Sequence, residues 1–290
     1  MPEITGKFHA SGKNLFYQSW LPEGDLKAVL VICHGVCEHS GRYMNLVIPL
    51  TRSGIAVWAY DHLGCGSSPG QRGHIDSWED FRSGLRAFLE VVYSNNPGLP
   101  IFLYAHSMGA LVALEIIQQG THGLKGVVLS GTPITPAGVG SPIKKLVARL
   151  LSRIKPTYSI DLGINGDNLS RDPRAVQAYR EDPLVQRFVT VRWGTEAMMV
   201  QQMVSSRPDQ VRLPVLFIHG SDDPLNLVSG VRSFFKQIPY PNKQLLVYEG
   251  SLHEPHNDLE HERVASDLIS WLEEHLPSLE KISDSTGGQT

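Results

Sequence analysis

Short apolar runs alternate with longer amphipathic stretches along most of the chain. The runs are continuous and rich in Val, Ile and Leu, a pattern typical of strands that are buried on both faces of a parallel sheet. Such strands are predicted at residues 28–33, 55–60, 101–104, 127–130, 215–219 and 245–248. The stretches between them predict helices at about 42–53, 78–94, 108–119, 228–237 and 259–276. Strands separated by helices indicate an α/β fold, in which a mostly parallel central sheet has helices on both faces and right-handed crossovers.

Two parts of the chain depart from this alternation. Residues 6–10 and 14–20 mix polar and apolar positions, and we expect an antiparallel hairpin there, on the edge of the sheet. Between 131 and 213 there is no buried-strand run, and because a structureless loop of that length is uncommon, we expect an inserted helical cap. The expected organisation is a core over 1–132, the cap over 133–212, the second part of the core over 213–276 and a disordered, Ser/Gly/Asp-rich tail over 277–290.

The first helix expected in the cap, at 142–155, combines basic and apolar side chains. Lys144, Lys145 and Arg149 supply positive charge beside apolar residues such as Leu146. Two interpretations are open: a cap helix whose basic face is solvated, or a helix that meets an anionic lipid surface.

Composition narrows the class of protein. The 290 residues include 41% hydrophobic side chains and carry a net charge of −3, which excludes a disordered, collagen-like or coiled-coil chain and gives no general attraction to nucleic acid. The three cysteines form no C-x-x-C pair, so reduced thiols are the simplest interpretation. Without an apolar signal core or a run of about 18 apolar residues, we expect a cytoplasmic protein, with peripheral contact to a membrane left open.

The strongest local motif is A-H-S-M-G at 105–109, between a predicted strand and a predicted helix. A serine on a sharp strand-to-helix turn presents its hydroxyl above the sheet, and small residues two positions before and after it allow the tight packing. Ser107 is therefore a candidate nucleophile. The alternative is that its side chain is only the N-cap of the helix.

A serine hydroxyl needs a base to take its proton and an acid to orient that base. Asp222 and Asp223 follow the strand at 215–219, and His253 follows the strand at 245–248. Catalytic groups gather outside the carboxyl ends of parallel strands, and the chain order Ser, Asp, His is that of α/β-hydrolases. Either aspartate could be the acid, since this segment also has the composition of a turn.

An ester or amide hydrolase also needs donors aimed at the developing oxyanion. We expect the backbone N–H of Met108, directly after the serine, to be one of them. The second is expected from the loop after the first parallel strand, where Gly35 allows close approach and Val36 would donate its N–H.

At this point the chain resembles the monoacylglycerol lipases and related lysophospholipases. The segment C-H-G-V-C-E-H-S-G-R-Y at 33–43 is similar to their H-G-x-x-E-H-S-G-R-Y block, 61–68 to their D-H-x-G-x-G-x-S loop, and H-S-M-G at 106–109 to their elbow. The similarity extends over about 16–276. Departures are Ala105, where the family usually has Gly, and Cys65, which often is His.

The resemblance implies a serine hydrolase that cleaves monoacylglycerols, small lipid esters, to fatty acid and glycerol, without metal or organic cofactor. It places the catalytic triad on Ser107, Asp223 and His253, with Asp223 favoured over Asp222, and the oxyanion hole on the Val36 and Met108 amides. It further suggests that three residues lie near the glycerol end of the substrate: Glu38, Arg42 and His256. An apolar tunnel under the cap would hold the acyl chain.

Other functions fit the same motifs. A lysophospholipase is the nearest alternative, followed by a general carboxylesterase or thioesterase, because a triad does not distinguish ester classes. A metal site at 253–256 lacks the H-E-x-x-H spacing, and Pro255 argues against a continuous helix there. A catalytically silent lipid-binding protein would leave the triad motifs unexplained.

Overall fold

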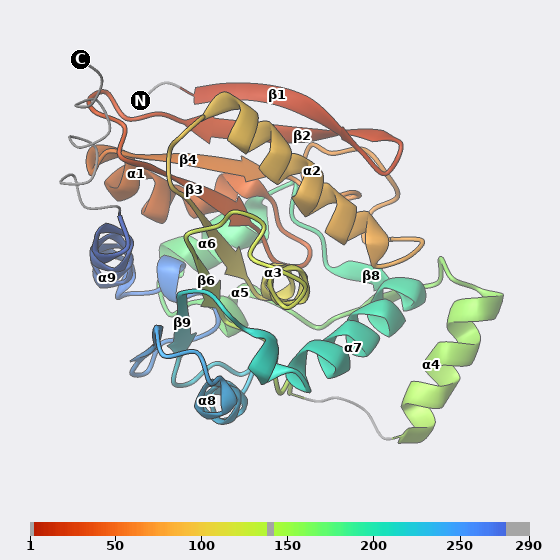
Figure 1. Cartoon of the computed structure of the whole chain (residues 1–290). Helices are drawn as coiled ribbons and strands as arrows, with labels where there is room; N and C mark the ends of the chain where they lie inside the picture. Colours follow the sequence, from red (N-terminus) through yellow and green to blue (C-terminus); the bar gives the residue numbers. More distant parts are fainter. Residues whose placement is uncertain (1–2, 138–141, 277–290) are drawn as a thin grey trace, which may run out of the picture.

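The computed structural model describes residues 3–137 and 142–276, with the backbone alone for 142–145. Its centre is an eight-stranded sheet with the order β1-β2-β4-β3-β5-β6-β9-β10 (Figure 1). The pairs β1–β2 and β2–β4 are antiparallel, and all other neighbouring strands of this sheet are parallel. The strands are β1 (Glu3–Ala10), β2 (Lys13–Trp20), β3 (Ala28–Cys33), β4 (Ile55–Tyr60), β5 (Ile101–His106), β6 (Gly126–Ser130), β9 (Val215–Gly220) and β10 (Lys243–Tyr248).

Helices cover both faces of the sheet and enclose two separate apolar cores. One core lies under α1 (Met44–Arg52) and α9 (His261–Glu274). The other lies under α2 (Glu79–Asn95), α3 (Met108–Ile117) and α8 (Val228–Gln237). Because successive side chains of a strand point to opposite faces, Ala28, Leu30 and Ile32 of β3 enter the first core while Val29, Val31 and Cys33 enter the second. This double burial explains the continuous apolar runs.

The predicted α/β fold and its strand and helix pattern are confirmed. Strands β3 and β4 have the predicted bounds, and the hairpin forms the sheet edge with Ala10 opposite Lys13. Ser11 and Gly12, which join the hairpin strands, both have positive φ, the backbone of a tight two-residue hairpin turn. The prediction of burial on both faces is wrong for β10, which is half-buried because it is an edge strand with one neighbour.

The segment between β6 and β9 is mostly helical and lies over one end of the sheet (Figure 1). Its two short strands, which pair antiparallel with each other, were not expected, because three residues are too few to show a pattern. Three 3₁₀ turns, η1 (Ser40–Tyr43), η2 (Pro208–Gln210) and η3 (Pro255–Asn257), complete the described elements. The elements of the insertion are α4 (Pro142–Ile154), β7 (Ser159–Asp161), α5 (Gly166–Leu169), α6 (Pro173–Glu181), β8 (Phe188–Thr190) and α7 (Val191–Ser205).

Helix α4 packs on α7 at the outer side of the insertion (Figure 1). The predicted tail 277–290 and the side chains of Lys144 and Lys145 lie outside the described residues. Of the helices described, none is both long enough and apolar enough to cross a membrane.

Candidate active site

Ser107 lies on the turn between β5 and α3, with the backbone conformation of a strained turn. Its φ of 52° and ψ of −118° are unusual for a residue with a side chain, and its hydroxyl makes no N-cap hydrogen bond to the helix. The N-cap alternative is therefore wrong. The backbone N–H of Ser107 donates to the Ser130 carbonyl at 2.9 Å, which ties the turn to β6.

Three side chains predicted from separate parts of the sequence meet at this turn. The Nε2 of His253 lies 2.9 Å from the Ser107 hydroxyl, and its Nδ1 lies 2.8 Å from a carboxylate oxygen of Asp223. With Nδ1–H donating to Asp223, Nε2 is free to accept the serine proton. All three residues are buried, so bulk water competes little for these bonds.

The two aspartates after β9 occupy different environments. Asp223 is buried, and its second oxygen accepts from the backbone N–H groups of Leu225 and Asn226, which hold the carboxylate toward His253. Asp222 is exposed and accepts from the hydroxyl of its neighbour Ser221. Geometry thus favours Asp223 as the partner of the histidine.

The electrostatics of the pair agree with this arrangement. Burial by itself lowers the pKa of His253, but the carboxylate of Asp223 outweighs it and raises that pKa above the ordinary 6.5. Burial alone would raise the pKa of Asp223, yet the facing His253 ring holds it below its usual value. The acid is therefore ionised at neutral pH and strengthens the histidine as a base.

The two residues expected to donate backbone N–H groups lie next to the serine. Met108 is the first residue of α3, where the backbone N–H has no helical carbonyl to bond. Val36 follows Gly35, whose backbone approaches so closely that a Cβ there would lie 3.2 Å from the Ser107 Cβ. Val36 and Ser107 line one cavity, and Val36 and Met108 line a second one.

Val36 lines two small cavities. One of about 20 Å³ touches Ser107 and has polar and apolar surface in about equal parts, with Ile164, Leu169 and Tyr179 of the insertion closing it. The other, of about 10 Å³, is bordered mainly by apolar groups, among them Leu63, Met108 and Trp193. Ligand pockets typically measure about 300 Å³ or more, so within the described residues the expected acyl tunnel is closed in this conformation. Binding a lipid requires the insertion to move.

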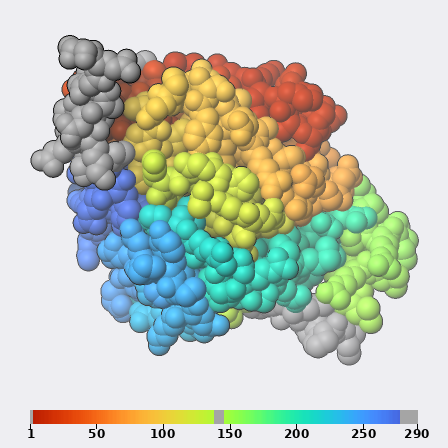
Figure 2. Space-filling model, viewed as in Figure 1, coloured from red at the N-terminus to blue at the C-terminus, as the bar shows by residue number. Residues whose placement is uncertain are grey.

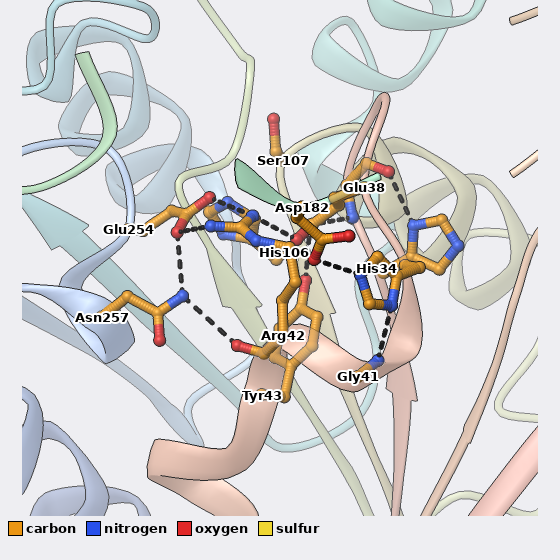
Figure 3. Close-up of polar contacts among 12 residues, drawn as sticks. His34, Glu38, Gly41, Arg42, Tyr43, His106, Ser107, Asp182, Glu254 and Asn257 are labelled. Atoms are coloured by element: carbon orange, nitrogen blue, oxygen red, sulfur yellow. Dashed lines mark hydrogen bonds and ion pairs between the residues drawn. The ribbon is translucent and has the colours of Figure 1, made fainter. Parts of the chain in front are cut away.

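A buried ion cluster forms the polar end of the first cavity (Figure 3). The Arg42 guanidinium donates to Glu38 at 2.8 Å and through two nitrogens to both oxygens of Glu254, each at 2.8 Å. Its planar group also lies over the Tyr179 ring, 4.9 Å from the centroid. Glu38 and Arg42 thus line the same cavity as Ser107, and their place at the glycerol end of the substrate stays a prediction. Glu254 was not predicted, because no sequence pattern shows that it meets a residue 212 positions away.

His256 lies behind this cavity and is not part of its lining, contrary to its expected place at the glycerol end. Its ring is fully buried and stacks parallel on Tyr43, 4.9 Å between centroids. Burial lowers its pKa to about 4, so the ring is neutral. The cavity is lined instead by His106, the residue before the nucleophile, whose ring packs edge-on against His256. The position of His106 directly before Ser107 in the strand-to-helix turn could have identified it as a cavity residue from the sequence.

One carboxylate closes the loop that carries His253. Asp258 accepts from the backbone N–H groups of Leu252 and Leu259 and from the Ser251 hydroxyl. It also accepts from the backbone and side chain of Arg171, in the insertion. The position of the histidine is therefore coupled to the position of the cap.

Other nucleophiles and metal donors are poorly placed. All three cysteines are buried and unpaired, and burial raises the pKa values of Cys33 and Cys37 to about 12, so these thiols are protonated at neutral pH. Among the described residues, no three His, Cys, Asp or Glu side chains gather in a group that could hold a metal ion.

The chain is similar to a family model, to curated proteins and to solved structures. Residues 24–260 match the family model described as "Serine aminopeptidase, S33". The chain is 30% identical to a monoacylglycerol lipase of Mycolicibacterium smegmatis, over 91% of this chain and 95% of that one. It is also 30% identical to the phospholipase YtpA of Bacillus subtilis, over 86% and 96% respectively. The crystal structure of the Paleococcus ferrophilus monoacylglycerol lipase superposes with a TM-score of 0.80 at 29% identity, covering 95% of this chain and all of that one.

We predict that Gly109→Ala destabilises the protein. A Cβ at Gly109 would lie 2.2 Å from the Cys33 carbonyl oxygen and 2.6 Å from that of His34, so the backbone at the end of β3 must shift. We expect a loss of about 1–3 kcal/mol in the free energy of unfolding, measured with urea.

Gly24→Ala is the matched control, because a Cβ there meets nothing within 4 Å and its φ is ordinary. Equal unfolding free energies for the two variants would show that the close contact between α3 and β3 is unimportant.

Proposed function

The chain belongs to the serine aminopeptidase S33 family and is a member of the monoacylglycerol lipase group of α/β-hydrolases, and on that premise we propose that it cleaves monoacylglycerols to fatty acid and glycerol. The observation that carries the proposal is the Ser107–His253–Asp223 chain of hydrogen bonds, which borders a cavity that Glu38, Arg42 and Glu254 also line. Relatives of the same length at about 30% identity support the substrate class.

The proposed reaction has two stages. Ser107 Oγ attacks the ester carbonyl while His253 Nε2 takes its proton, and Asp223 holds the imidazole in the required tautomer. The Val36 and Met108 amides stabilise the oxyanion, and glycerol leaves with the proton from His253. Water activated by the same histidine then attacks the acyl-enzyme and releases the fatty acid, restoring the serine. In this second stage His253 takes a proton from the water and gives it to Ser107 Oγ, so that the serine and the histidine both end the cycle unchanged.

The experiment that tests this function measures release of glycerol and fatty acid from a monoacylglycerol by the purified protein. Ser107→Ala should lower kcat by about 10⁴-fold or more, because the variant lacks the hydroxyl that His253 contacts through Nε2. Its unfolding free energy should stay within about 1 kcal/mol of the wild type. Turnover that survives in the variant, or a wild-type protein that leaves the monoacylglycerol intact, would contradict the proposal.

The acid of the triad can be tested with two neighbouring substitutions. Asp223→Asn should lower kcat by about 10⁴-fold, because the amide would hold His253 in the wrong tautomer. Asp222→Asn is the matched control and should stay near wild-type activity, since Asp222 is exposed and the contact described for its carboxylate is with the hydroxyl of its neighbour Ser221. The reverse ranking of the two kcat values would assign the role to Asp222.

We further propose that α4 brings the enzyme to lipid surfaces. The helix turns Leu146, Val147, Leu150 and Ile154 away from α7, and each is more than half exposed. Figure 2 shows this helix at the outer edge of the molecule. A row of large apolar side chains with Arg149 and Arg153 beside it has the character of an interfacial helix.

A cytoplasmic location is also proposed, supported by three cysteines without a disulfide.

Membrane contact predicts weaker vesicle binding when the apolar row is made polar. The double variant Leu150→Ser, Ile154→Ser should bind anionic phospholipid vesicles about tenfold or more weakly in a sedimentation assay, because two exposed apolar contacts are lost. Ile4→Ser, at an exposed position on the edge strand β1, is the control and should leave binding unchanged. If binding is equal in all three proteins, α4 is not the contact surface.

A further inference from the structure

The relatives of similar identity include a monoacylglycerol lipase and a phospholipase. A glycerol headgroup is neutral, whereas a phospholipid headgroup carries a phosphate. Overall similarity therefore does not tell which of these two headgroups this chain accepts. The charged residues around the cavity at Ser107 distinguish between the two headgroups.

Among the described residues that line this cavity, two carboxylates face one cation. Glu38 and Glu254 are the carboxylates and Arg42 is the cation. The histidines add no lasting positive charge: burial holds the pKa of His106 well below its ordinary value, and His253 must be neutral to act as the base. The cavity thus carries an excess of one negative charge.

The single cation is already occupied. Arg42 uses one nitrogen for both glutamates and a second nitrogen for the other oxygen of Glu254, all at 2.8 Å (Figure 3). Bidentate carboxylate binding is the same geometry by which arginine binds phosphate. A phosphate group can reach this guanidinium edge only by displacing Glu254.

Because the excess negative charge is buried, it interacts strongly with a charged headgroup in the cavity. The side chains of Arg42 and Glu254 are 9% and 3% exposed, so dissolved salt screens them little. Burial alone would raise the pKa of Glu254, but Arg42 lowers it to about 2, so the carboxylate stays charged across the working pH range. The Asn257 side-chain amide donates to the same carboxylate at 2.8 Å and fixes it toward the arginine.

Neutral and anionic headgroups meet this arrangement differently. Glycerol hydroxyls are donors and can share the carboxylate oxygens, whereas a phosphate has only acceptors to offer when ionised. The basic residues that would suit a phosphate, Arg149 and Arg153, lie exposed on α4 and not in the cavity lining.

We infer that Glu254 is a specificity-determining residue: by occupying Arg42 and adding a buried negative charge, it makes the site select esters with uncharged polyol headgroups and reject those that carry phosphate. This inference rests on the proposed function, of which it names the headgroup class. Glu38 is less suited to this role, because it also accepts from the Gly35 amide and the Tyr43 hydroxyl and so supports the loop that carries Val36.

The test compares kcat/KM for a monoacylglycerol and for the lysophosphatidate with the same acyl chain. The wild-type enzyme should prefer the monoacylglycerol by at least about tenfold, with a ratio that changes little between low and high salt because the charges are buried. Glu254→Gln should lower the ratio several-fold by raising the relative kcat/KM for lysophosphatidate. Glu254→Asp, which keeps the charge, should keep the preference even where its rates fall.

Glu260→Gln is the matched control, because Glu260 also pairs with an arginine, Arg171, but does not line the cavity. Its ratio should equal that of the wild type. A wild-type preference for lysophosphatidate, or a ratio that Glu254→Gln leaves unchanged, overturns the inference. The ratio of the two kcat/KM values for the wild-type enzyme needs no variant, so the inference can still be tested if the Glu254→Gln protein fails to fold.

Failure of the inference and failure of the proposed function give different results. A protein that cleaves p-nitrophenyl butyrate through Ser107 but neither glycerol ester is not a monoacylglycerol lipase, and the inference falls with the proposed function. A protein that cleaves the monoacylglycerol efficiently, with equal ratios for Glu254→Gln and Glu260→Gln, keeps the proposed function and loses only the role of Glu254.

Discussion

The close approach of α3 to the end of β3 is the constraint on which the site depends. Gly109 lies so near the Cys33 and His34 carbonyl groups that no side chain fits there. This contact forces Ser107 into its strained turn and places the first amide of α3 beside the loop that carries Val36. Ser107 and the expected oxyanion donors are thus positioned by one backbone contact, and the strain is balanced by the packing of two fully buried elements.

A second interaction organises the polar end of the site. Arg42 comes from the turn after β3, Glu254 from the loop after β10, and Tyr179 from the insertion, and the guanidinium joins all three. A buried cation of this kind is stable only when it is surrounded by partners, so the core, the histidine loop and the cap hold one another in place. Asp258 and Arg171 add a parallel connection between the histidine loop and the cap.

The closed cavities and the exposed apolar row on α4 both concern the insertion. A lipid headgroup and acyl chain need far more space than the about 20 Å³ and 10 Å³ present, so binding must accompany a movement of the insertion. The apolar residues Leu146, Val147, Leu150 and Ile154 lie on that same insertion. A surface that favours lipid would therefore act on the element that has to move.

Much of the fold could be predicted because its cause is local. Strands such as β3 and β4 are buried on both faces, so their apolar runs are continuous and their bounds are visible in the sequence. Local signals weaken where burial is partial or elements are short, as at the edge strand β10 and the three-residue strands β7 and β8. The triad positions could also be predicted, since each follows the carboxyl end of a parallel strand, where open sheets gather their functional groups.

By itself, then, the sequence determined the α/β fold, the position of Ser107 on a sharp strand-to-helix turn and the chain order serine, aspartate, histidine, because each depends on short segments with a strong local pattern. Only the tertiary structure decided which aspartate faces His253, that His256 lies behind the cavity, and that Glu254 joins Arg42. These outcomes depend on contacts between residues far apart in the chain. The free energy of a buried charge depends on all the groups around it in space, and a local sequence pattern does not show which groups these are.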